Sequence, residues 1–480
     1  MLRLPHTRNE PVVMRWEGGA IEARAGDSVA AALYAAGIRT LTRSRKFHRP
    51  RGLSGSFVDG VLARVDGVPN QRLDQVLVRD GLEVLAQNVW PNLRWDVLRA
   101  ARAIPRPLLR AGFEHPRWLP SGTWAFDRWE ALLRLAAAGA DGPDSRAVLP
   151  IAPGRRLGAE TVVVGGGPAG RKAAGVEAAQ GKRVVLVSRG LVPEPPAGVE
   201  ILAGHEVFGL YRGAGIVACA PLDGGPATLI DAGRVVLATG RRSCPPLVSG
   251  ADLPGVMDAH AGLHLARDCA VAPGRRVVVI GTDEREAVAG LLRDLGVGVV
   301  AVIAAADLRR VIGCSAVTGV EAGRRIACDA VVHVGPWRPD PSLPFQAAAE
   351  GIYRLAAKGQ AIVEVIGAAA SPPEPVVFGP RLDDRALVCP CLDVTVAEVR
   401  DLARRGETHV EVVKRLTGCG MGPCQGVPCW DLLAAALGAI TGEAPESFGR
   451  PSLRPPRRAL SLAQAAGLAG LVEPPGEPTA

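Results

Sequence analysis

The sequence predicts an α/β protein of several domains, and three observations support this prediction. Its 480 residues exceed what one hydrophobic core normally supports, which indicates about two to four domains. A strand, a glycine-rich turn, a helix and a second strand follow one another over residues 160–187, as in a βαβ unit. Five of the ten cysteines lie between Cys389 and Cys429. This concentration of cysteine distinguishes the region near the carboxyl end from the rest of the chain and indicates a separate domain there.

The composition is that of a globular protein without a membrane span. Hydrophobic residues make up 48% and charged residues 22% of the chain, and no apolar run is long enough to cross a bilayer. The first residues, MLRLPHTRNEP, lack the apolar core of a signal peptide, so we expect a cytoplasmic protein. The net charge is +8, but basic and aromatic residues are not interleaved, so nucleic acid is not an expected partner.

The first hundred residues follow a β-grasp order. Residues 11–24 alternate around a Gly-Gly turn, which predicts a β-hairpin. Ser28 can cap a short helix over 29–36. Strand-like runs then follow at 61–67 and 75–88.

A basic loop separates this helix from the later strands. It contains Arg39, Arg43, Arg45, Lys46, His48, Arg49 and Arg51. One interpretation is an electropositive contact for a phosphate or for the acidic face of a partner. The other, which we favour, is an internal structural role in which the arginines bond to backbone carbonyls and acidic neighbours.

Residues 156–378 have a Rossmann-like pattern. Gly165, Gly167 and Gly170 form G-x-G-x-x-G directly after a strand and at the start of a helix. In such a turn the first Gly makes the bend, the second lets a pyrophosphate approach the backbone, and the third allows close helix–strand packing. The glycines therefore predict a dinucleotide site. The alternative is a Rossmann-like unit that binds no nucleotide.

The second strand of this unit departs from the usual pattern. It ends at Ser188 and Arg189, where an acidic residue normally holds the ribose hydroxyls. Arg189 either meets a 2′-phosphate or marks a site that has lost its nucleotide. A second βαβ start at 275–296 keeps Gly281 but has Asp283 in place of the second Gly, so we expect that half to be mainly structural.

The cysteine-rich segment contains two close pairs of thiols. Cys389 and Cys391 form C-x-C, while Cys424 and Cys429 form C-x4-C. Four thiolates suit a [2Fe-2S] cluster or a tetrahedral zinc ion, and spacing alone leaves both open. Glycine and proline around each pair let backbone amides point at sulfur. We take these four cysteines as metal ligands and Cys419, a fifth thiol, as a non-ligand.

The remaining regions are expected to connect domains and not to carry catalytic residues. No Ser-His-Asp or paired-carboxylate arrangement can be assigned, so the catalytic residues stay unknown. Residues 101–155 hold several prolines and five aromatic residues, which predicts a connecting arm with one helix. The Pro- and Arg-rich tail from Arg450 is expected to be extended, either free or laid on a partner. The predicted domains are 1–100, 101–155, 156–378, 379–448 and 449–480.

Six segments spread along the chain carry a family resemblance. They are GDSVAAALYAAGI (26–38), RSRKFHRPRGL (43–53), DGLEVLAQNVWPNLRWD (80–96), DLPGVMDA (252–259), VKRLTGCGMGPCQG (413–426) and RPPRRAL (454–460). In these segments the chain resembles the N-terminal half of the alpha subunit of heterotetrameric sarcosine oxidase and its relatives. The relatives include subunits of opine oxidases, hydrogen cyanide synthase and heteromeric amino-acid dehydrogenases.

This resemblance implies a fold, cofactors and a partner. The fold is a β-grasp ferredoxin-like N-terminal domain, a Rossmann-like FAD/NAD(P)-binding domain and a small helical BFD-like [2Fe-2S]-binding domain. By position, the three glycines match the dinucleotide turn, and the four cysteines match the [2Fe-2S] set of the opine oxidase and amino-acid dehydrogenase branch. The implied partner is an FAD-dependent beta subunit of the amine or amino-acid oxidase type, with FMN at the interface.

The chain departs from the family in three places. Its N-terminal domain has no cysteine, so that domain cannot hold a cluster. The acidic ribose ligand is missing, and VIGAAAS at 365–371 lacks the Gly-Asp often placed near a flavin. The sequence also ends before the folate-binding domain of the sarcosine oxidase alpha subunit, so transfer of a one-carbon unit to tetrahydrofolate is not expected.

We therefore predict an oxidoreductase subunit that is not active alone. It would belong to a heteromeric flavin-dependent amine or amino-acid oxidase or dehydrogenase of the sarcosine, opine or proline type. Electrons from the partner flavoprotein would reach a [2Fe-2S] centre in this chain. Two alternatives are a stand-alone NAD(P)H-dependent flavin reductase, motivated by Arg189, and a structural scaffold whose cysteines hold zinc.

Overall fold

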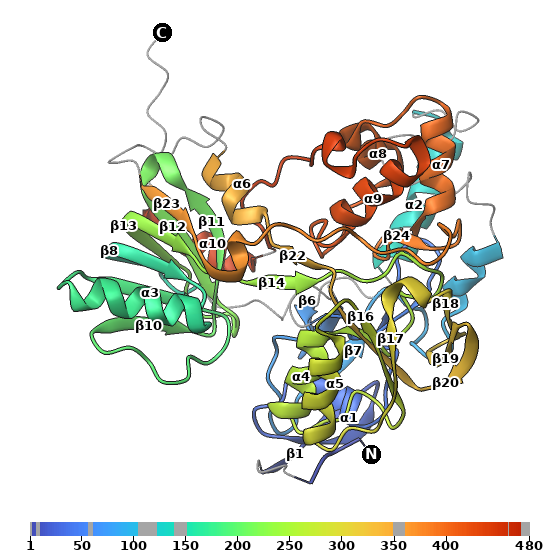
Figure 1. Ribbon diagram of the computed structural model, residues 1–480, viewed down its shortest axis with the longest axis horizontal. Coiled ribbons are helices and arrows are strands. Elements are labelled where there is room, and N and C mark those ends of the chain that lie inside the picture. Colours follow the sequence, from blue (N-terminus) through green and yellow to red (C-terminus); the bar gives the residue numbers. More distant parts are fainter. Residues whose placement is uncertain are drawn as a thin grey trace. The chain divides into compact units, whose positions relative to one another are not determined.

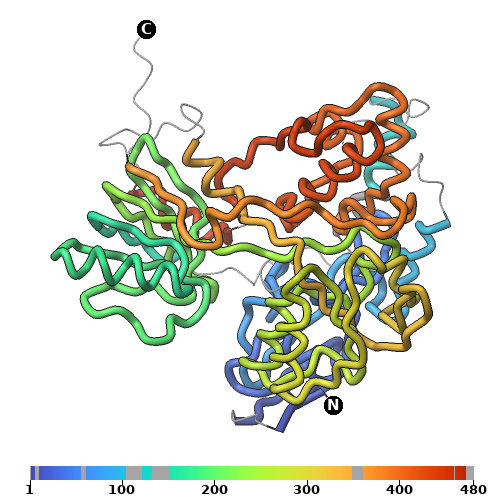
Figure 2. The backbone as a smooth tube through the Cα atoms, in the orientation of Figure 1, coloured from blue at the N-terminus to red at the C-terminus, as the bar shows by residue number. Residues whose placement is uncertain are grey.

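The protein folds into two compact units, each built from three segments of the chain (Figures 1 and 2). The computed structural model describes residues 2–5, 10–55, 61–103, 122–138, 151–348, 361–458 and 460–471. Unit 1 consists of Met1–Val148, Ser243–Trp337 and Glu374–Pro451. Unit 2 consists of Leu149–Arg242, Arg338–Pro373 and Ser452–Ala480.

Unit 1 begins with a five-stranded sheet of the β-grasp type, as the sequence predicts. Its order is β2-β1-β7-β5-β6, formed by β1 (Pro11–Trp16), β2 (Gly19–Arg24), β5 (Leu62–Val65), β6 (Val68–Arg72) and β7 (Glu83–Ala86). The first two strands form the predicted hairpin, and β1 pairs with β7 in parallel. Helix α1 (Val29–Ala35) starts where the Ser28 hydroxyl accepts a hydrogen bond from the Ala31 N–H, and all its residues are buried.

The basic loop folds as a small hairpin that follows α1. Strands β3 (Thr42–Arg43) and β4 (Pro50–Arg51) pair in antiparallel fashion, with Thr42 opposite Arg51. Backbone hydrogen bonds from Leu41 N–H to the Arg51 carbonyl and from Ser44 N–H to the Arg49 carbonyl close the loop. The loop is therefore an ordered part of unit 1 and not a solvent-exposed loop.

The middle segment of unit 1 is a parallel sheet covered by two helices. The order is β15-β21-β16-β17, formed by β15 (Val256–Asp258), β21 (Ala330–Val334), β16 (Val277–Gly281) and β17 (Val299–Ala304). Helices α4 (Ala259–Arg267) and α5 (Arg285–Asp294) pack beside each other on it (Figure 1). Three antiparallel strands follow β17 along the chain, namely β18 (Arg310–Gly313), β19 (Val317–Ala322) and β20 (Arg324–Ala327).

The last segment of unit 1 is mostly helical. A short antiparallel pair, β24 (Leu387–Cys389) and β25 (Val394–Thr395), leads into α7 (Val396–Arg404), α8 (Val410–Thr417) and α9 (Cys429–Thr441). Thr395 caps α7, because its hydroxyl accepts from the Glu398 N–H while the Glu398 carboxylate accepts from the Thr395 N–H. Helix α9 buries most of its residues.

Unit 2 contains the predicted Rossmann-like sheet. Its parallel part has the order β10-β9-β8-β13-β23, formed by β8 (Arg155–Val164), β9 (Val184–Ser188), β10 (Val199–Ala203), β13 (Thr228–Leu237) and β23 (Ile362–Val365). Strands β11 (His205–Tyr211) and β12 (Ile216–Pro221) extend β13 in antiparallel fashion. Helices α3 (Pro168–Ala179) and α6 (Ser342–Ala348) complete the unit, and β14 (Arg241–Ser243) and β22 (Trp337–Pro339) lie where the chain leaves and re-enters it.

The Pro- and Arg-rich tail is extended, as expected, but it lies on unit 2 of its own chain. Arg458 is buried and its guanidinium is 2.8 Å from the Glu206 carboxylate, while Arg457 pairs with Asp340. Beyond the extended part, helix α10 (Leu462–Gly467) begins at a Ser461 capping box. Neighbouring leucines of the tail pack against the apolar faces of β11, β12 and β13.

Two further expectations concern the arm and the membrane. The predicted arm at 101–155 lies mostly outside the described residues; its one described helix is α2 (Trp124–Ala138). None of the helices in the described part of the chain combines the length and the apolar character needed to span a bilayer.

The tail contact can be tested by removing one guanidinium. Arg458→Met removes one guanidinium from the buried Glu206 carboxylate and leaves Arg189, at 3.5 Å, in place. We expect the free energy of unfolding to fall by about 2 kcal/mol, the cost typical of a lost charged hydrogen bond in the interior. The measurement is the urea midpoint. Arg454→Met, on the exposed side of the same segment, is the control and should change stability by no more than about 0.5 kcal/mol; equal effects of the two substitutions would contradict the prediction.

Candidate functional site

The structure brings all five cysteines of the carboxyl-terminal region to one place in unit 1. Cys389 ends strand β24, and Cys391 follows it in the turn to β25. Cys419 comes directly after the left-handed Gly418 that terminates α8, and Cys429 is the first residue of α9. Cys424 lies between them in a glycine-rich loop. All five are buried.

The sulfur atoms lie at contact distances from one another. The Cys391 and Cys424 sulfurs are 3.4 Å apart, and those of Cys424 and Cys429 are 3.8 Å apart. Cys389 is within hydrogen-bond reach of Cys429 and also of Cys419. The two cysteine pairs predicted from the sequence therefore meet, and the fifth thiol, which sequence reasoning set aside, joins them.

Backbone amides contribute to the electrostatics of this sulfur group. Hydrogen bonds from the Cys419 and Cys429 thiols, and then from the backbone N–H groups of Gly420 and Leu392, hold the pKa of Cys389 well below its usual value. The thiols of Cys391 and Cys429, followed by the Gly426 N–H, do the same for the pKa of Cys424. Hydrogen bonds to Cys389 or Cys424, followed by burial, raise the pKa of the other three thiols, Cys391, Cys419 and Cys429. Two of the five sulfurs therefore favour the thiolate, which is the form that binds metals.

Three glycines shape the loop around the sulfurs. A Cβ atom on Gly422 would lie 2.4 Å from the Cβ atom of Cys391, and one on Gly420 or Gly426 would lie 2.1 or 1.9 Å from the Trp430 indole. Gly420 and Gly426 also have positive φ angles, of 74° and 82°, a conformation that favours glycine. The GMGPCQG motif is therefore needed to let the loop close over Trp430 and Cys391.

The residues present fit a [2Fe-2S] cluster. Such a cluster takes four thiolates and accepts hydrogen bonds at sulfur, and the loops supply both. The indole N–H of Trp430 is also buried without a hydrogen-bond partner among the described residues, as expected where an acceptor is not part of the chain.

The basic loop contacts the turn that carries Cys391. Asp393, two residues further on, accepts a hydrogen bond from the Phe47 N–H at 3.1 Å and pairs with the Arg49 guanidinium at 3.3 Å. The Cys391 sulfur also acts on Arg51 of this loop: burial lowers the pKa of the guanidinium, and the charge of the neighbouring cysteines, Cys391 first, raises it by more. The favoured interpretation of this loop, an internal role with acidic neighbours, agrees with these contacts, whereas nothing in the sequence pattern indicated the contact with cysteine.

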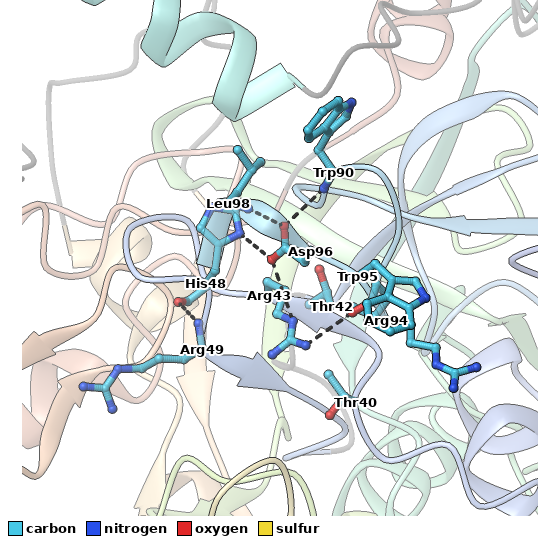
Figure 3. Close-up of polar contacts among 12 residues, drawn as sticks. Thr40, Thr42, Arg43, His48, Arg49, Trp90, Arg94, Trp95, Asp96 and Leu98 are labelled. Carbon is cyan, nitrogen blue, oxygen red and sulfur yellow. Dashed lines mark hydrogen bonds and ion pairs between the residues drawn. The ribbon is translucent and has the colours of Figure 1, made fainter. Parts of the chain in front are cut away.

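A second set of buried contacts holds the loop in place (Figure 3). The His48 ring lies 2.9 Å from the Asp96 carboxylate, which also accepts from the Trp90 and Leu98 N–H groups. Burial raises the pKa of Asp96, but the hydrogen bond with His48 and those from the backbone outweigh it, so the pKa is lowered overall. The Arg43 guanidinium, whose Nε lies 3.9 Å from the same carboxylate, donates to the Leu93 carbonyl.

The dinucleotide turn of unit 2 has the geometry that its three glycines predict. Gly165 has φ of 118°, and a Cβ there would lie 2.2 Å from the Ala238 carbonyl oxygen. A Cβ on Gly170 would lie 1.9 Å from the Gly165 oxygen. Gly167, in contrast, has nothing within 4 Å of its Cβ position and begins α3 without a side-chain cap. Open space next to a helix N-terminus fits an approaching pyrophosphate.

Arg189 lies beyond the end of β9 and already has an acidic partner. Its guanidinium is 3.5 Å from Glu206, the buried carboxylate that Arg458 also contacts. Two guanidinium groups thus share one carboxylate. The assignment of Arg189 to a 2′-phosphate stays a prediction.

The fold and the cysteine site define a multidomain α/β protein with a β-grasp part, a Rossmann-like part and a helical, cysteine-bearing part. A family model described as a 2Fe-2S iron-sulfur cluster binding domain matches residues 9–89, and one described as the sarcosine oxidase A3 domain matches residues 383–468. The first range contains no cysteine, and the second contains all five of the clustered ones. The match at the amino end therefore rests on the scaffold of that domain and not on cysteines, and the clustered cysteines lie in the other matched range.

Comparison with characterised proteins confirms the resemblance to the sarcosine oxidase alpha subunit. The chain is 27% identical to that subunit from Rhizobium meliloti (strain 1021) over 93% of this chain and 57% of the relative. It is 36% identical to an opine oxidase subunit from the same organism over 21% of each chain. The chain thus spans a little over half the length of the sarcosine oxidase subunit that it resembles.

A solved structure agrees on the fold. The crystal structure of L-proline dehydrogenase from P. horikoshii superposes with a TM-score of 0.74 at 22% identity, covering 96% of this chain and 99% of that one. The likeness supports the whole arrangement of a β-grasp part, a Rossmann-like part and a helical part along one chain.

The ligand set can be tested by changing one thiol at a time. Serine is a poorer ligand for iron than cysteine thiolate, so Cys424→Ser should lose most of the iron and acid-labile sulfide bound per chain. Cys419→Ser is the matched control, because the side chain is equally buried and lies in the same group of sulfurs, and it should keep its iron. Equal losses in the two variants would make Cys419 a ligand.

The dinucleotide turn can be tested without disturbing the fold. Gly167→Ala adds a methyl group where only a pyrophosphate would meet it, so we expect dinucleotide affinity to fall at least tenfold while stability changes by no more than about 1 kcal/mol. Binding is measured with FAD and NADPH, and stability by thermal unfolding. Gly213→Ala, which also has open space at its Cβ, is the control. Unchanged affinity for both ligands in Gly167→Ala would show that the turn does not hold a pyrophosphate.

Proposed function

We propose that this chain is the electron-transferring subunit of a heteromeric flavin-dependent amine or amino-acid oxidase or dehydrogenase. The single observation that supports this most is the group of buried cysteines, with sulfurs 3.4 and 3.8 Å apart. The proposed ligands of a [2Fe-2S] cluster are Cys389, Cys391, Cys424 and Cys429. The proposed partner is an FAD-dependent subunit that oxidises the substrate.

In this proposal the partner subunit oxidises the substrate, and this chain transfers the electrons. Oxidation of an amine to an imine releases two electrons, which the partner's flavin would take up. A [2Fe-2S] cluster, when bound, would accept these electrons one at a time and pass them on. This chain's own residues would bury the sulfurs, direct amide N–H groups at them and fix their distance from the partner.

The Rossmann-like part has a separate place in this proposal. Gly165, Gly167 and Gly170 would hold the diphosphate of FAD or NAD(P), and the resemblance to the sarcosine oxidase alpha subunit supports FMN at the interface with the partner. The second candidate function is reduction of a flavin by NAD(P)H. The positive charge shared by Arg189 and Arg458 around Glu206 favours it.

Anaerobic mixing experiments test the proposal. The chain is co-expressed with a flavoprotein of the amine-oxidase class encoded beside it, and the purified complex is mixed with sarcosine, proline or an opine. We expect substrate to bleach the flavin and then to produce the EPR signal of a reduced [2Fe-2S] cluster. In the Cys424→Ser complex the flavin should still bleach, and the EPR signal should be absent.

Three results would contradict the proposal. One is full dehydrogenase activity of this chain without a partner. Another is one equivalent of zinc and no iron in protein purified without oxygen. The third is reduction of the cluster by NADPH but never by substrate, which would favour the reductase instead.

A further inference from the structure

The charge of the cysteine site needs a counter-charge inside unit 1. A cluster held by four thiolates carries net negative charge, and charge in a buried, low-dielectric site is costly unless a positive group lies nearby. All five cysteines are buried, so bulk water cannot provide that balance. The balancing group therefore has to come from the chain itself.

Arg51 is a cation that contacts the sulfurs. Burial lowers the pKa of Arg51, but the neighbouring sulfurs of Cys391, Cys424 and Cys389 raise it by more, which puts the guanidinium beside the cysteine site. An arginine keeps its proton at any pH at which the protein is folded, so this positive charge is permanent. Arg51 is more than 300 residues away from these cysteines in the sequence.

Independent contacts fix Arg51 in this position. Its backbone is part of the hairpin of β3 and β4, in which it faces Thr42. The loop between these strands is joined to Asp393 through the Phe47 N–H and the Arg49 guanidinium. Because these contacts attach the hairpin to the turn of Cys391, the guanidinium does not depend on the sulfur contact alone for its place.

We propose that Arg51 is the counter-charge of the cluster and raises its reduction potential. The inference rests on the proposed function, since it requires that the four cysteines hold a [2Fe-2S] cluster. Reduction adds one negative charge, and a guanidinium in contact with a ligand sulfur stabilises the reduced form more than the oxidised form. A hydrogen bond to a ligand sulfur acts in the same direction, and both are known determinants of the potential of such clusters.

This assigns a role to the β-grasp domain that lacks cysteines. The domain has the scaffold of an iron–sulfur domain but no thiol of its own. Its basic hairpin instead supplies a charge to the sulfurs held by the opposite end of the chain. Arg51 is thus a positioning and charge-balancing residue, and it does not act on substrate.

The test is a redox titration of the full-length chain, followed by EPR in the absence of oxygen. Arg51→Met removes the charge, Arg51→Lys keeps it, and Arg45→Met is the matched control because Arg45 is exposed on the same hairpin. We expect Arg51→Met to lower the equilibrium constant for reduction about tenfold, which is about 59 mV for a one-electron couple. Arg51→Lys should retain most of the wild-type potential, and Arg45→Met should retain all of it.

Each other outcome has a defined meaning. A potential in Arg51→Met equal to that of Arg45→Met overturns the inference while leaving the proposed function intact, and so does a fall in Arg51→Lys as large as in Arg51→Met. Loss of iron from Arg51→Met but not from Arg51→Lys supports it, because charge is then required to hold the cluster. Loss of iron from both variants overturns it in favour of a packing role. Wild-type protein without a cluster contradicts the proposed function itself.

Discussion

Burial of sulfur is the constraint on which the organisation of unit 1 depends. Several thiolates cannot lie together in an apolar interior unless donors and cations surround them. The glycine-rich loop around Cys424 provides backbone N–H groups, because only glycine lets it approach Trp430 and Cys391 so closely. In our proposal, Arg51 of the basic hairpin provides the positive charge. Since these two parts come from opposite ends of the chain, the cysteine site requires the β-grasp domain to be folded.

Much of the fold could be predicted because its signals are local. Alternation around a Gly-Gly turn identified the β1–β2 hairpin, and a capping residue identified the helix that begins after Ser28. The glycines of the nucleotide turn were recognised because each has a different steric reason to be glycine. The extent of the arm could not be judged, since most of it lies outside the described residues.

The site was predicted only in part, because its remaining members are distant in sequence. Four cysteines could be paired from their spacing, but the position of Cys419 beside Cys389 depends on how α8 ends, at the left-handed Gly418. The contact of Arg51 with Cys391 joins segments that no local pattern relates. The tail gave a similar result: its extended form followed from proline, whereas its attachment to Glu206 depended on a carboxylate some 250 residues earlier.

The three-segment construction of unit 1 has a consequence for evolution and for protein engineering. The cysteine-bearing helices look like a detachable module, yet excision at residue 379 would leave Asp393 facing water in place of the Phe47 amide and the Arg49 side chain. If the helical segment were moved to another protein, its [2Fe-2S] cluster would therefore have a different reduction potential, even if the cluster still assembled. Gene fusions or fissions in this lineage should therefore keep the first hundred residues and the helical segment on one polypeptide.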